Sequence, residues 1–432
     1  MKRVLFITYY FPPSGGSGVQ RGLKMVKYLA REGWEPLVLT VDPDHASYPD
    51  LDPAMAADIP EGTRVERTEA WDPYALYARF MGKKKKDAVG VGFLGADHAS
   101  AKERFARWIR ANLFLPDARV GWASHATRAA RALFEDPGFD AIVTTGPPHS
   151  THLIGARLAR TTGKPWVADL RDAWPDPAYA EMLPSSGLAR RRDRKMRARA
   201  LEAASVCIAV TDDLAAQMKA ATGHDFRVIR NGFDPADFSE KHLADLDRFR
   251  ITHTGNLGPA RDPEPLWTVL SKPENRDRWP ALMVQLVGNV DPGIEGVIRK
   301  AGLSDRIERI RYVPHHEATQ WMQRAALLLL PINRVGDAAG IVTGKIYEYL
   351  ASGRPVVGLG EPDGEAARIL ADSGAGTMLD WTDADGLEAL IDRHYAAWAE
   401  GEPINGASPE QLAPYSRRQQ AAALARILDE LT

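Results

Sequence analysis

The sequence has little of several features that would each restrict the class of protein. It contains one cysteine, Cys207, inside the apolar run 205–210, which excludes a disulfide framework and fits a reducing compartment. The formal net charge is −2, so the overall charge gives no reason to expect nucleic acid as a partner. No apolar run approaches the roughly 20 residues of a membrane span. The short apolar stretch after Lys2 and Arg3 is expected to be a first strand rather than a signal peptide, and the protein to be cytoplasmic.

What the sequence does contain is a long alternation of apolar strand-like runs with helical patterns. In the first half the runs are Val4–Thr8, Pro36–Val41, Ala141–Gly146, Pro165–Leu170, Val206–Thr211 and Arg227–Arg230. In the second half they are Arg250–Gly255, Leu282–Gly288, Ile307–Val313, Ala326–Ile332 and Pro355–Leu359. Continuous apolar strands separated by helices indicate parallel sheets that are covered on both faces. Because 432 residues exceed what one core usually supports, we expect an α/β protein with two doubly wound domains.

The domain boundary is expected in the turn-rich segment 231–238, which precedes a charged stretch. This gives a first domain of residues 1–235 and a second domain of residues 236–410. The segment 68–114 does not alternate strand with helix, and we interpret it as an insertion in the first domain. A final helix is expected at Arg418–Leu431, within a C-terminal segment 411–432.

A glycine-rich loop, FPPSGGSG, follows the first strand and precedes a helical pattern. The spacing of Gly16, Gly18 and Gly22 does not match the dinucleotide-binding fingerprint G-x-G-x-x-G. The loop is therefore either a plain turn or a place where backbone amides and a helix N-terminus meet a phosphate or a sugar.

The segment GIVTGKIYEYLASGRPVVGLG, residues 340–360, predicts a helix followed by a buried strand, with Thr343 as N-cap. Lys345 and Glu348 are three residues apart and therefore lie on one helical face. A lysine near a helix N-terminus opposes the helix dipole, which makes sense if an anion shares the site. Glu348 could then accept hydrogen bonds from a ribose diol. The alternative is a surface ion pair between the two side chains.

Other polar clusters also follow strands, where ligands bind in parallel sheets. The loop 253–262 supplies Arg261, whose planar guanidinium suits phosphate oxygens, unless it forms an ordinary ion pair with a neighbouring acid. In the first half, one cluster covers 144–152 and another, with alternating Asp, Arg, Asp and a tryptophan, covers 169–174. The second is either a buried structural Arg–Asp pair or a set of contacts to the hydroxyls of a polar substrate.

Six of these segments, in this order, resemble the family 4 glycosyltransferases. They are YYFPPSGGSGVQR, TTGPPHSTHLIG, PWVADLRDAW, VIRNGFDPADF, ITHTGNLGPARDPEPL and GKIYEYLASGRPVV. The resemblance covers residues 1–376 and the final helix. It implies the GT-B architecture, with two Rossmann-like domains facing across a cleft and a C-terminal helix that crosses back to the first domain. It also implies retaining transfer of a sugar from a nucleotide diphosphate, independent of metal, with the donor against the second domain and the acceptor against the first.

The resemblance also assigns roles to individual residues. Arg261 and Lys345 look like the pair that grips the donor diphosphate, and Asp172 or His149 occupies the neighbourhood of the reacting carbon. The other donor-binding candidates are Gly16, Gly18, Gly255, Asn256, Val313, His315, Thr343, Gly344 and Glu348. The acceptor-side candidates are Arg171, Trp174 and His152. The sequence departs from the family at Gly340, where the first glutamate of the E-x7-E motif is expected; backbone amides of 339–343 or Asp337 are the candidate replacements.

Two basic stretches bear on the acceptor. Seven basic residues lie within positions 190–199 on a predicted helix, and Lys83–Lys86 follows an aromatic stretch. They form either a solvated face or a contact with anionic lipid headgroups. We expect a hexosyltransferase at the inner face of the cell membrane that uses a UDP-sugar, needs no cofactor, and glycosylates a lipid-linked or surface-polysaccharide acceptor. The basic stretches lack a recognised nucleic-acid motif.

Two rival interpretations stay open. A nucleotide-sugar 2-epimerase has the same architecture but needs a carboxylate base near C2 of the sugar. A non-catalytic protein that binds sugar nucleotides would explain the missing glutamate at Gly340.

Overall fold

The computed structural model describes residues 1–48, 50–71, 101–175, 184–336 and 338–432. It divides into two compact units, an N-terminal unit of Met1–Arg230 with Arg417–Thr432, and a C-terminal unit of Asn231–Ser416. The first boundary therefore falls five residues before the position we expected, because Phe233 and Phe238 pack in the core of the C-terminal unit. The return to the N-terminal unit begins at Arg417 rather than at residue 411.

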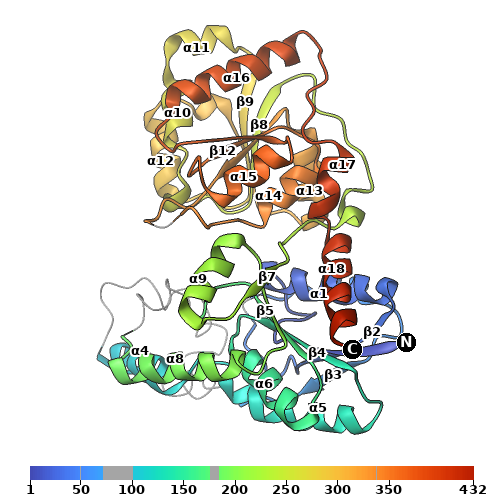
Figure 1. Ribbon diagram of the computed structural model, residues 1–432. Helices are drawn as coiled ribbons and strands as arrows, with labels where there is room; N and C mark the ends of the chain where they lie inside the picture. Colours follow the sequence, from blue (N-terminus) through green and yellow to red (C-terminus); the bar gives the residue numbers. More distant parts are fainter. Residues whose placement is uncertain (49, 72–100, 176–183, 337) are drawn as a thin grey trace. The chain divides into compact units, whose positions relative to one another are not determined.

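The N-terminal unit is built on a seven-stranded sheet with the order β3-β2-β1-β4-β5-β6-β7 (Figure 1). Every neighbouring pair in it is parallel. The strands are β1 (Lys2–Ile7), β2 (Trp34–Val41), β3 (Val65–Thr68), β4 (Ala141–Gly146), β5 (Trp166–Leu170), β6 (Val206–Ala209) and β7 (Phe226–Val228). Strand order 3-2-1-4-5-6 is the winding of a Rossmann-like domain.

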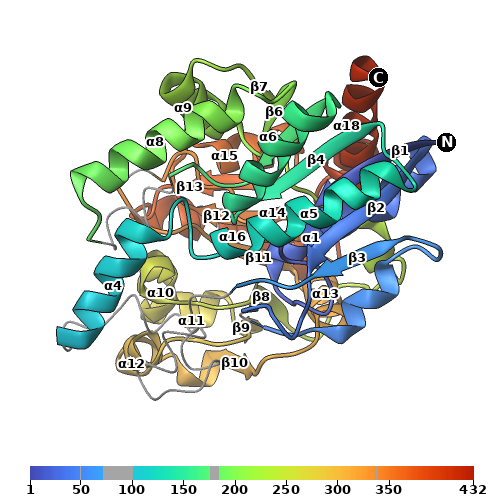
Figure 2. The same ribbon diagram turned by 90° about the horizontal axis from the view of Figure 1, so that it is seen from below.

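Apolar side chains on both faces of this sheet explain why its strands read as continuous apolar runs. Along β1, Val4 and Phe6 face α1 (Ser17–Leu29) and α18 (Arg417–Leu431). Leu5 and Ile7 face the opposite layer, which contains the helices α5 (Ala123–Glu135), α6 (Ser150–Thr162), α8 (Gly187–Leu201) and α9 (Asp212–Thr222). Seen from below, α5 and α6 lie across one face of the sheet (Figure 2).

The C-terminal helix α18 belongs to the N-terminal unit because of its apolar stripe. Ala421, Leu424 and Leu428 are almost fully buried, and they pack in one core with residues of α1 such as Leu23 and Val26. Spacings of three and four residues place the apolar positions of α18 on one face, so the helix buries that face against α1.

The C-terminal unit repeats the same winding in a six-stranded sheet, with the order β10-β9-β8-β11-β12-β13. Its parallel strands are β8 (Phe249–Thr254), β9 (Leu282–Val287), β10 (Ile307–Ile310), β11 (Leu327–Pro331), β12 (Val356–Leu359) and β13 (Gly376–Leu379). One face packs on α10 (Glu264–Ser271), α12 (Pro292–Lys300) and α16 (Ala384–Ala399). The other packs on α13 (His315–Arg324), α14 (Lys345–Ala351) and α15 (Glu365–Asp372). The expected fold class, two Rossmann-like parallel-sheet domains, is confirmed.

The sequence prediction missed two strands, β3 and β13, and both are edge strands. An edge strand has a neighbour on one side only, so fewer of its side chains need to be apolar. All four residues of β3 are only half-buried, and β13 has a single buried residue. Cys207 is a buried residue of β6, as expected, and burial raises the pKa of its thiol to about 12.

The remaining helices are short or lie outside these layers. They are α4 (Ala101–Leu113), α11 (Pro273–Arg278), α17 (Pro409–Leu412) and the 3-10 helices Ala30–Glu32, Pro53–Asp58, Val120–Trp122, Pro235–Phe238, Pro259–Arg261, Ser304–Arg306 and Ala413–Tyr415. Of the helices that the structure describes, none is long and apolar enough to cross a membrane. Helix α4 falls within the expected insertion 68–114, and residues 72–100 of that insertion, including Lys83–Lys86, lie outside the described residues.

Candidate functional site

Each sheet has one place where its winding reverses direction, between β1 and β4 in the N-terminal unit and between β8 and β11 in the C-terminal unit. At such a point the two neighbouring strands continue into loops that run apart, which leaves a crevice at the carboxyl ends of the strands. The candidate site residues of each unit are therefore best described from this point outwards.

Two glycines let a lysine approach the backbone at the end of β8. Gly255 has φ 95° and Gly288, after β9, has φ 122°, conformations that L side chains rarely adopt. A Cβ on Gly255 would lie 2.5 Å from Cε of Lys345, and a Cβ on Gly288 would lie 2.6 Å from the carbonyl oxygen of Gly255. A side chain at position 255 would therefore displace Lys345, and a side chain at position 288 would displace the backbone of Gly255.

Lys345 is the first residue of α14, and the helix start differs from our expectation. The N-cap position is Gly344, without a side-chain cap, rather than Thr343. The hydroxyl of Thr343 accepts a long hydrogen bond of 3.4 Å from the backbone N–H of Lys345. The expected N-cap therefore differs by one position from the observed one, although the hydroxyl of Thr343 still satisfies one backbone N–H of the first turn.

The charge of Lys345 is poorly compensated by the protein. Burial, and then the nearby charge of Arg261, lower the pKa of Lys345 from 10.5 to about 8, while Glu348 acts weakly in the opposite direction. Beneath it, the buried His253 has a pKa lowered to about 3, first by burial and then by Lys345. Among the described residues, no carboxylate forms an ion pair with Lys345. Two cations thus lie close together at a place that an anion would stabilise.

Arg261 connects the two loops that flank the reversal point. It ends the 3-10 helix Pro259–Arg261 after β8, and its Nε donates a hydrogen bond to Oδ1 of Asn333, which follows β11. The alternative of an ion pair with a neighbouring acid is not found for Arg261 among the acids that the structure describes. Asp262 accepts from Nε1 of Trp267 at 2.7 Å instead.

Glu348 and His315 are brought together from α14 and α13. Nε2 of His315 lies 3.0 Å from Oε1 of Glu348, and about one third of each side chain is exposed. The alternative that we considered, a surface ion pair between Lys345 and Glu348, is therefore wrong, because the carboxylate of Glu348 pairs with His315 instead. Val313 precedes α13 and is half-buried, and Asn256 is exposed after Gly255.

Sequence reasoning missed three residues that support this crevice. Asn333 holds Arg261, Gly288 makes room for the backbone of Gly255, and the buried Tyr349 accepts a 2.9 Å hydrogen bond from the backbone N–H of Thr254. Asn333 and Gly288 each follow a strand, and Tyr349 lies in the same helix as Lys345. These positions are the features of the sequence from which the three residues could have been predicted.

The position of the missing glutamate, Gly340, lies in a loop held by backbone hydrogen bonds. Ile341 N–H donates to the carbonyl of Ala338 at 3.0 Å, and the N–H of the buried Glu365 donates to the carbonyl of Ala339 at 2.7 Å. The other replacement that we considered, Asp337, lies outside the described residues.

In the N-terminal unit, Arg171 holds the glycine-rich loop. Its guanidinium donates to the carbonyls of Gly18 at 2.5 Å, Pro147 at 2.6 Å and Gly146 at 3.1 Å. These hydrogen bonds tie the loop after β1 to the loop after β4, and Gly16 in the first loop is exposed with φ 85°. Arg171 was expected on the acceptor side, but its donors are used on backbone carbonyls, so we assign it as a positioning residue.

Asp169 belongs to a buried ion pair, although with a partner that we did not expect. Arg21 of α1 contacts both carboxylate oxygens, at 2.7 and 2.9 Å, and both residues are almost fully buried. Thr145 donates a further 2.7 Å hydrogen bond to Asp169. The Arg21 charge, after the opposing effect of burial, leaves the pKa of Asp169 below its usual value. The structural interpretation of this carboxylate is therefore the correct one.

Two acceptor-side candidates, His152 and Trp174, are in the core. Thr144 Oγ1 accepts a hydrogen bond from Nε1 of Trp166 at 2.8 Å and is also hydrogen-bonded to Nδ1 of His152 at 2.8 Å. Burial lowers the pKa of His152 to about 3, so the ring is neutral. Trp174 is 1% exposed and donates to Asp193 at 3.1 Å. Both side chains are almost fully buried, so neither is accessible to an acceptor in this structure.

The two remaining candidates of this unit differ in access. His149 stacks on Trp174 with 5.2 Å between ring centroids, and its Nε2 lies 3.0 Å from the carbonyl of Ala173. Burial lowers its pKa to about 4, so it is neutral at physiological pH. Within the described part of the chain, Nδ1 of His149 has no hydrogen-bond partner. Asp172 is exposed.

No group of three or more His, Cys, Asp or Glu side chains within the described ranges could hold a metal ion.

The sequence model of the glycosyl transferase 4-like domain matches residues 15–232, about half of the chain. The protein therefore belongs to the glycosyl transferase 4-like family. No curated protein matches the chain by sequence.

Solved structures resemble the whole chain. A sucrose-phosphate synthase from Thermosynechococcus elongatus is 16% identical with a TM-score of 0.61, over 100% of this chain and 99% of that one. Anabaena HepE in complex with UDP is 15% identical with a TM-score of 0.62, over 100% of both chains. The lipopolysaccharide outer core galactosyltransferase WaaB is 10% identical with a TM-score of 0.57, over 99% of this chain and 100% of that one. At these identities the likeness establishes the GT-B fold.

Proposed function

We propose that the protein is a retaining glycosyltransferase that moves a hexose from a UDP-sugar onto a lipid-linked or surface-polysaccharide acceptor. The observation that carries the proposal is the pair Arg261 and Lys345, two neighbouring cations at the carboxyl end of the C-terminal sheet, with a lysine pKa near 8. A nucleoside diphosphate supplies the missing negative charge. Anabaena HepE, which shares the fold, has been solved with UDP and with UDP-glucose, which supports uridine as the base.

In the proposed reaction, the bond between the sugar C1 and the diphosphate oxygen breaks, and both electrons leave with the diphosphate. The two cations stabilise that developing charge, which is where preorganised electrostatics contributes most to catalysis. The acceptor hydroxyl forms the new bond to C1 on the same face, and its proton passes to a phosphate oxygen of the leaving group. The mechanism requires no protein nucleophile, metal ion or further cofactor.

The other residues receive supporting roles in the proposal. Glu348, oriented by His315, accepts hydrogen bonds from the ribose. Backbone N–H groups of 339–343 bind the donor sugar in place of the missing glutamate. Asp172, which is exposed, accepts a hydrogen bond from a reacting hydroxyl. His149, the other candidate near the reacting carbon, is buried and supports the loop that carries Asp172 through its hydrogen bond to the carbonyl of Ala173. The remaining candidates for donor contacts are Gly16, Gly18, Gly255, Asn256, Val313, Thr343 and Gly344.

The test is a turnover assay with UDP-glucose and UDP-galactose, in the presence and absence of membrane extracts that contain acceptor. UDP release that depends on acceptor supports transfer. Release or isomerisation without acceptor would indicate an epimerase or a hydrolase and overturn the proposal. Donor binding without turnover would identify a binding protein and would also overturn the proposal. The reaction without acceptor is needed as a control because a protein assigned as a UDP-N-acetylglucosamine 2-epimerase from Listeria monocytogenes shares the fold at 14% identity.

The proposal includes a position at the cytoplasmic face of the cell membrane. It is supported by the basic surface of α8, since each Lys or Arg near an anionic leaflet contributes about 1 kcal/mol to binding. Sedimentation with vesicles of anionic and of neutral lipid tests it; equal binding to both would remove this part of the proposal.

A further inference from the structure

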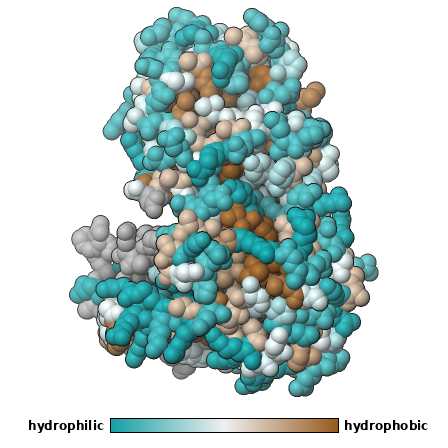
Figure 3. Space-filling model, in the orientation of Figure 1, coloured by the Kyte–Doolittle hydropathy of each residue, from teal (hydrophilic) through white to brown (hydrophobic). Residues whose placement is uncertain are grey.

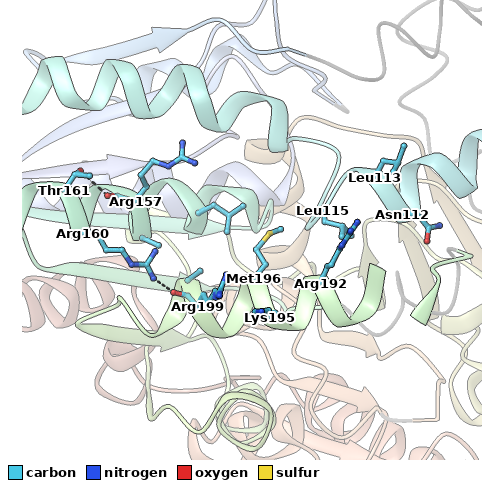
Figure 4. A pocket seen from close by; sticks show the side chains of 13 residues that line it. Asn112, Leu113, Leu115, Arg157, Arg160, Thr161, Arg192, Lys195, Met196 and Arg199 are labelled. Carbon is cyan, nitrogen blue, oxygen red and sulfur yellow. Dashed lines mark hydrogen bonds between the residues drawn. The ribbon is translucent and has the colours of Figure 1, made fainter. Parts of the chain in front are cut away.

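A cavity of about 740 Å³ lies in the N-terminal unit, among the end of α4, the outer side of α6 and one side of α8 (Figure 4). We call it the α6–α8 groove. It lies apart from the loops that follow β1 and β4, and its volume is in the range of sites for small organic ligands.

The groove has an apolar floor and a basic rim. The floor consists of buried and half-buried apolar side chains, namely Leu115, Leu153, Ala156, Met196 and Ala200. The rim consists of five exposed cations, Arg157, Arg160, Arg192, Lys195 and Arg199. Such a lining matches a ligand with an apolar chain and an anionic end.

The structure sorts the seven basic residues of α8 into three groups. Arg192, Lys195 and Arg199 are spaced three and four residues apart, so they form one stripe along the groove. Arg197 is buried and donates to the backbone carbonyl of Trp174. Arg190, Arg191 and Arg194 are exposed but do not line the groove. Figure 3 shows hydrophilic side chains gathered over α8 on this face of the molecule.

The rim carries a positive charge that its protein surroundings do not neutralise. Arg160 donates to the backbone carbonyl of Arg199, as Figure 4 shows, and this bond leaves both charges in place. Across the ranges that the structure describes, none of the five rim cations forms an ion pair with a carboxylate, whereas Arg230 and Lys219 of the same unit each do. A face that served only for solubility would need neither the hollow nor its apolar floor.

We propose that the α6–α8 groove binds one anionic phospholipid of the membrane, with an acyl chain against the apolar floor and the phosphate on the basic rim. The adjoining end of α4 exposes Trp108 and Leu113 to 46% and 63%, and a tryptophan beside a cationic surface suits the headgroup region of a bilayer. The inference rests on the membrane position proposed above and deepens it, because it assigns one bound lipid to one groove instead of a general attraction of α8 to an anionic leaflet. This lipid is neither the sugar donor nor the acceptor.

The experiment is calorimetric titration of the full chain with dihexanoylphosphatidylglycerol, a soluble short-chain anionic lipid. The groove variant Arg192→Gln/Lys195→Gln/Arg199→Gln should lose about 100-fold in affinity. The matched control Arg190→Gln/Arg191→Gln/Arg194→Gln removes the same charge from the same helix and should lose less than about threefold. All six positions are exposed on α8, and glutamine is a good helix former, so both variants should fold.

A second variant tests the apolar floor without changing charge. Met196→Gln should weaken binding of the lipid by about tenfold, because the chain loses apolar contact. Glycerol phosphate, which has the headgroup but no chain, should bind much more weakly than the lipid. Equal binding of both ligands would mean a phosphate site only, and equal losses in the groove and control variants would mean general surface charge; either would overturn the proposal.

Two further ligands complete the test. The zwitterionic dihexanoylphosphatidylcholine should bind more weakly than the anionic lipid. A short oligonucleotide that displaced the anionic lipid with equal affinity would instead identify a nucleic-acid surface and overturn the proposal. None of these titrations contains a sugar donor, so they test lipid binding in the groove independently of the proposed transferase activity.

Discussion

Arginine and lysine side chains cluster at the reversal point of both sheets, but their charges are compensated differently. In the N-terminal unit, Arg21 forms a bidentate pair with Asp169, and Arg171 donates to three backbone carbonyls. In the C-terminal unit, Lys345 and Arg261 lie close enough for each charge to affect the other, and among the described residues neither pairs with a carboxylate. Burial of a cation therefore does not by itself mark a ligand site; a stronger sign is a buried cation whose charge neither an internal anion nor a set of backbone carbonyls compensates.

The largest expected effect comes from breaking the compensated pair. Asp169→Asn leaves the guanidinium of Arg21 buried without its counter-charge, and the loss of one partner of a buried pair costs about 3–5 kcal/mol. Urea unfolding should show this loss for the transition of the N-terminal unit. The matched control, Asp225→Asn, removes an exposed carboxylate paired with Lys219 at 2.6 Å and should leave the unfolding transition almost unchanged, because solvent screens a pair this exposed.

A double variant sharpens the same point. Arg21→Met/Asp169→Leu replaces both charges with apolar groups of similar size, so it should recover much of the stability that Asp169→Asn loses. If the single variant were as stable as the wild type, the charge of Arg21 would not depend on Asp169, and the contrast between the two units would fail.

The second effect concerns the uncompensated pair. Lys345→Met should reduce kcat/KM for sugar transfer by about 100- to 1,000-fold, because removing one preorganised charge from a transition state costs about that much. The control, Lys272→Met, removes a lysine of the same unit that already pairs with Glu388 at 2.6 Å, and it should leave kcat/KM near the wild-type value. Transfer near the wild-type rate in Lys345→Met would show that the ammonium does not face the leaving group.

The same substitution should make the protein more stable while making it inactive. Because the folded protein lowers the pKa of Lys345 from 10.5 to about 8, the charged lysine destabilises the fold below pH 8. With allowance for water around a partly exposed side chain, Lys345→Met should add about 1–2 kcal/mol at pH 7, measured as a higher melting temperature. Saturating UDP should stabilise the wild type more than the variant. A variant less stable than the wild type would contradict the uncompensated charge.

The pH dependence of UDP binding follows from the same pKa. Below about pH 8 the lysine of the free protein is protonated, and above it the lysine must take up a proton to bind a diphosphate well. The dissociation constant should therefore rise by up to about tenfold per pH unit above pH 8. Lys345→Arg keeps its charge at every accessible pH and should show a flat profile. A flat profile in the wild type would exclude titration of this lysine in binding.

Much of the fold could be predicted because a two-sided parallel sheet requires nearly continuous apolar strands. The central strands met that condition, whereas β3 and β13, at the sheet edges, are short and half-exposed and left no such signal. The proximity of Arg261 and Lys345 was also predictable, since both follow parallel strands whose carboxyl ends share one edge of the sheet.

The partners of individual side chains could not be predicted. Arg21 and Asp169 are 148 residues apart in the sequence, and nothing local distinguishes Arg21 from Arg171 as the partner of that carboxylate. His152 and Trp174 occupy positions typical of ligand contacts, yet both side chains are almost fully buried. Sequence position indicates which edge of a sheet a residue occupies, but whether its side chain points inwards depends on packing between distant segments.

The smallest expected effect lies at the rim of the C-terminal crevice, where His315 and Glu348 are about one third exposed. A pair this exposed contributes at most about 1 kcal/mol, so His315→Ala should barely change the melting temperature. It should weaken UDP binding by only a few fold, because Glu348 keeps its carboxylate but loses the neighbour that orients it. Glu348→Gln should weaken binding further, since it removes the negative charge that accepts hydrogen bonds from the ribose.

Comparing UDP with 2′-deoxy-UDP in calorimetry checks the assignment of Glu348 to the ribose. If Glu348 holds the ribose, the wild type should bind UDP more tightly than 2′-deoxy-UDP, and Glu348→Gln should bind the two ligands with equal affinity. The affinity difference in His315→Ala should be smaller than in the wild type but larger than in Glu348→Gln. Equal affinities in the wild type would assign this pair to the stability of the C-terminal unit alone, and the functional contrast would then rest on Arg261 and Lys345.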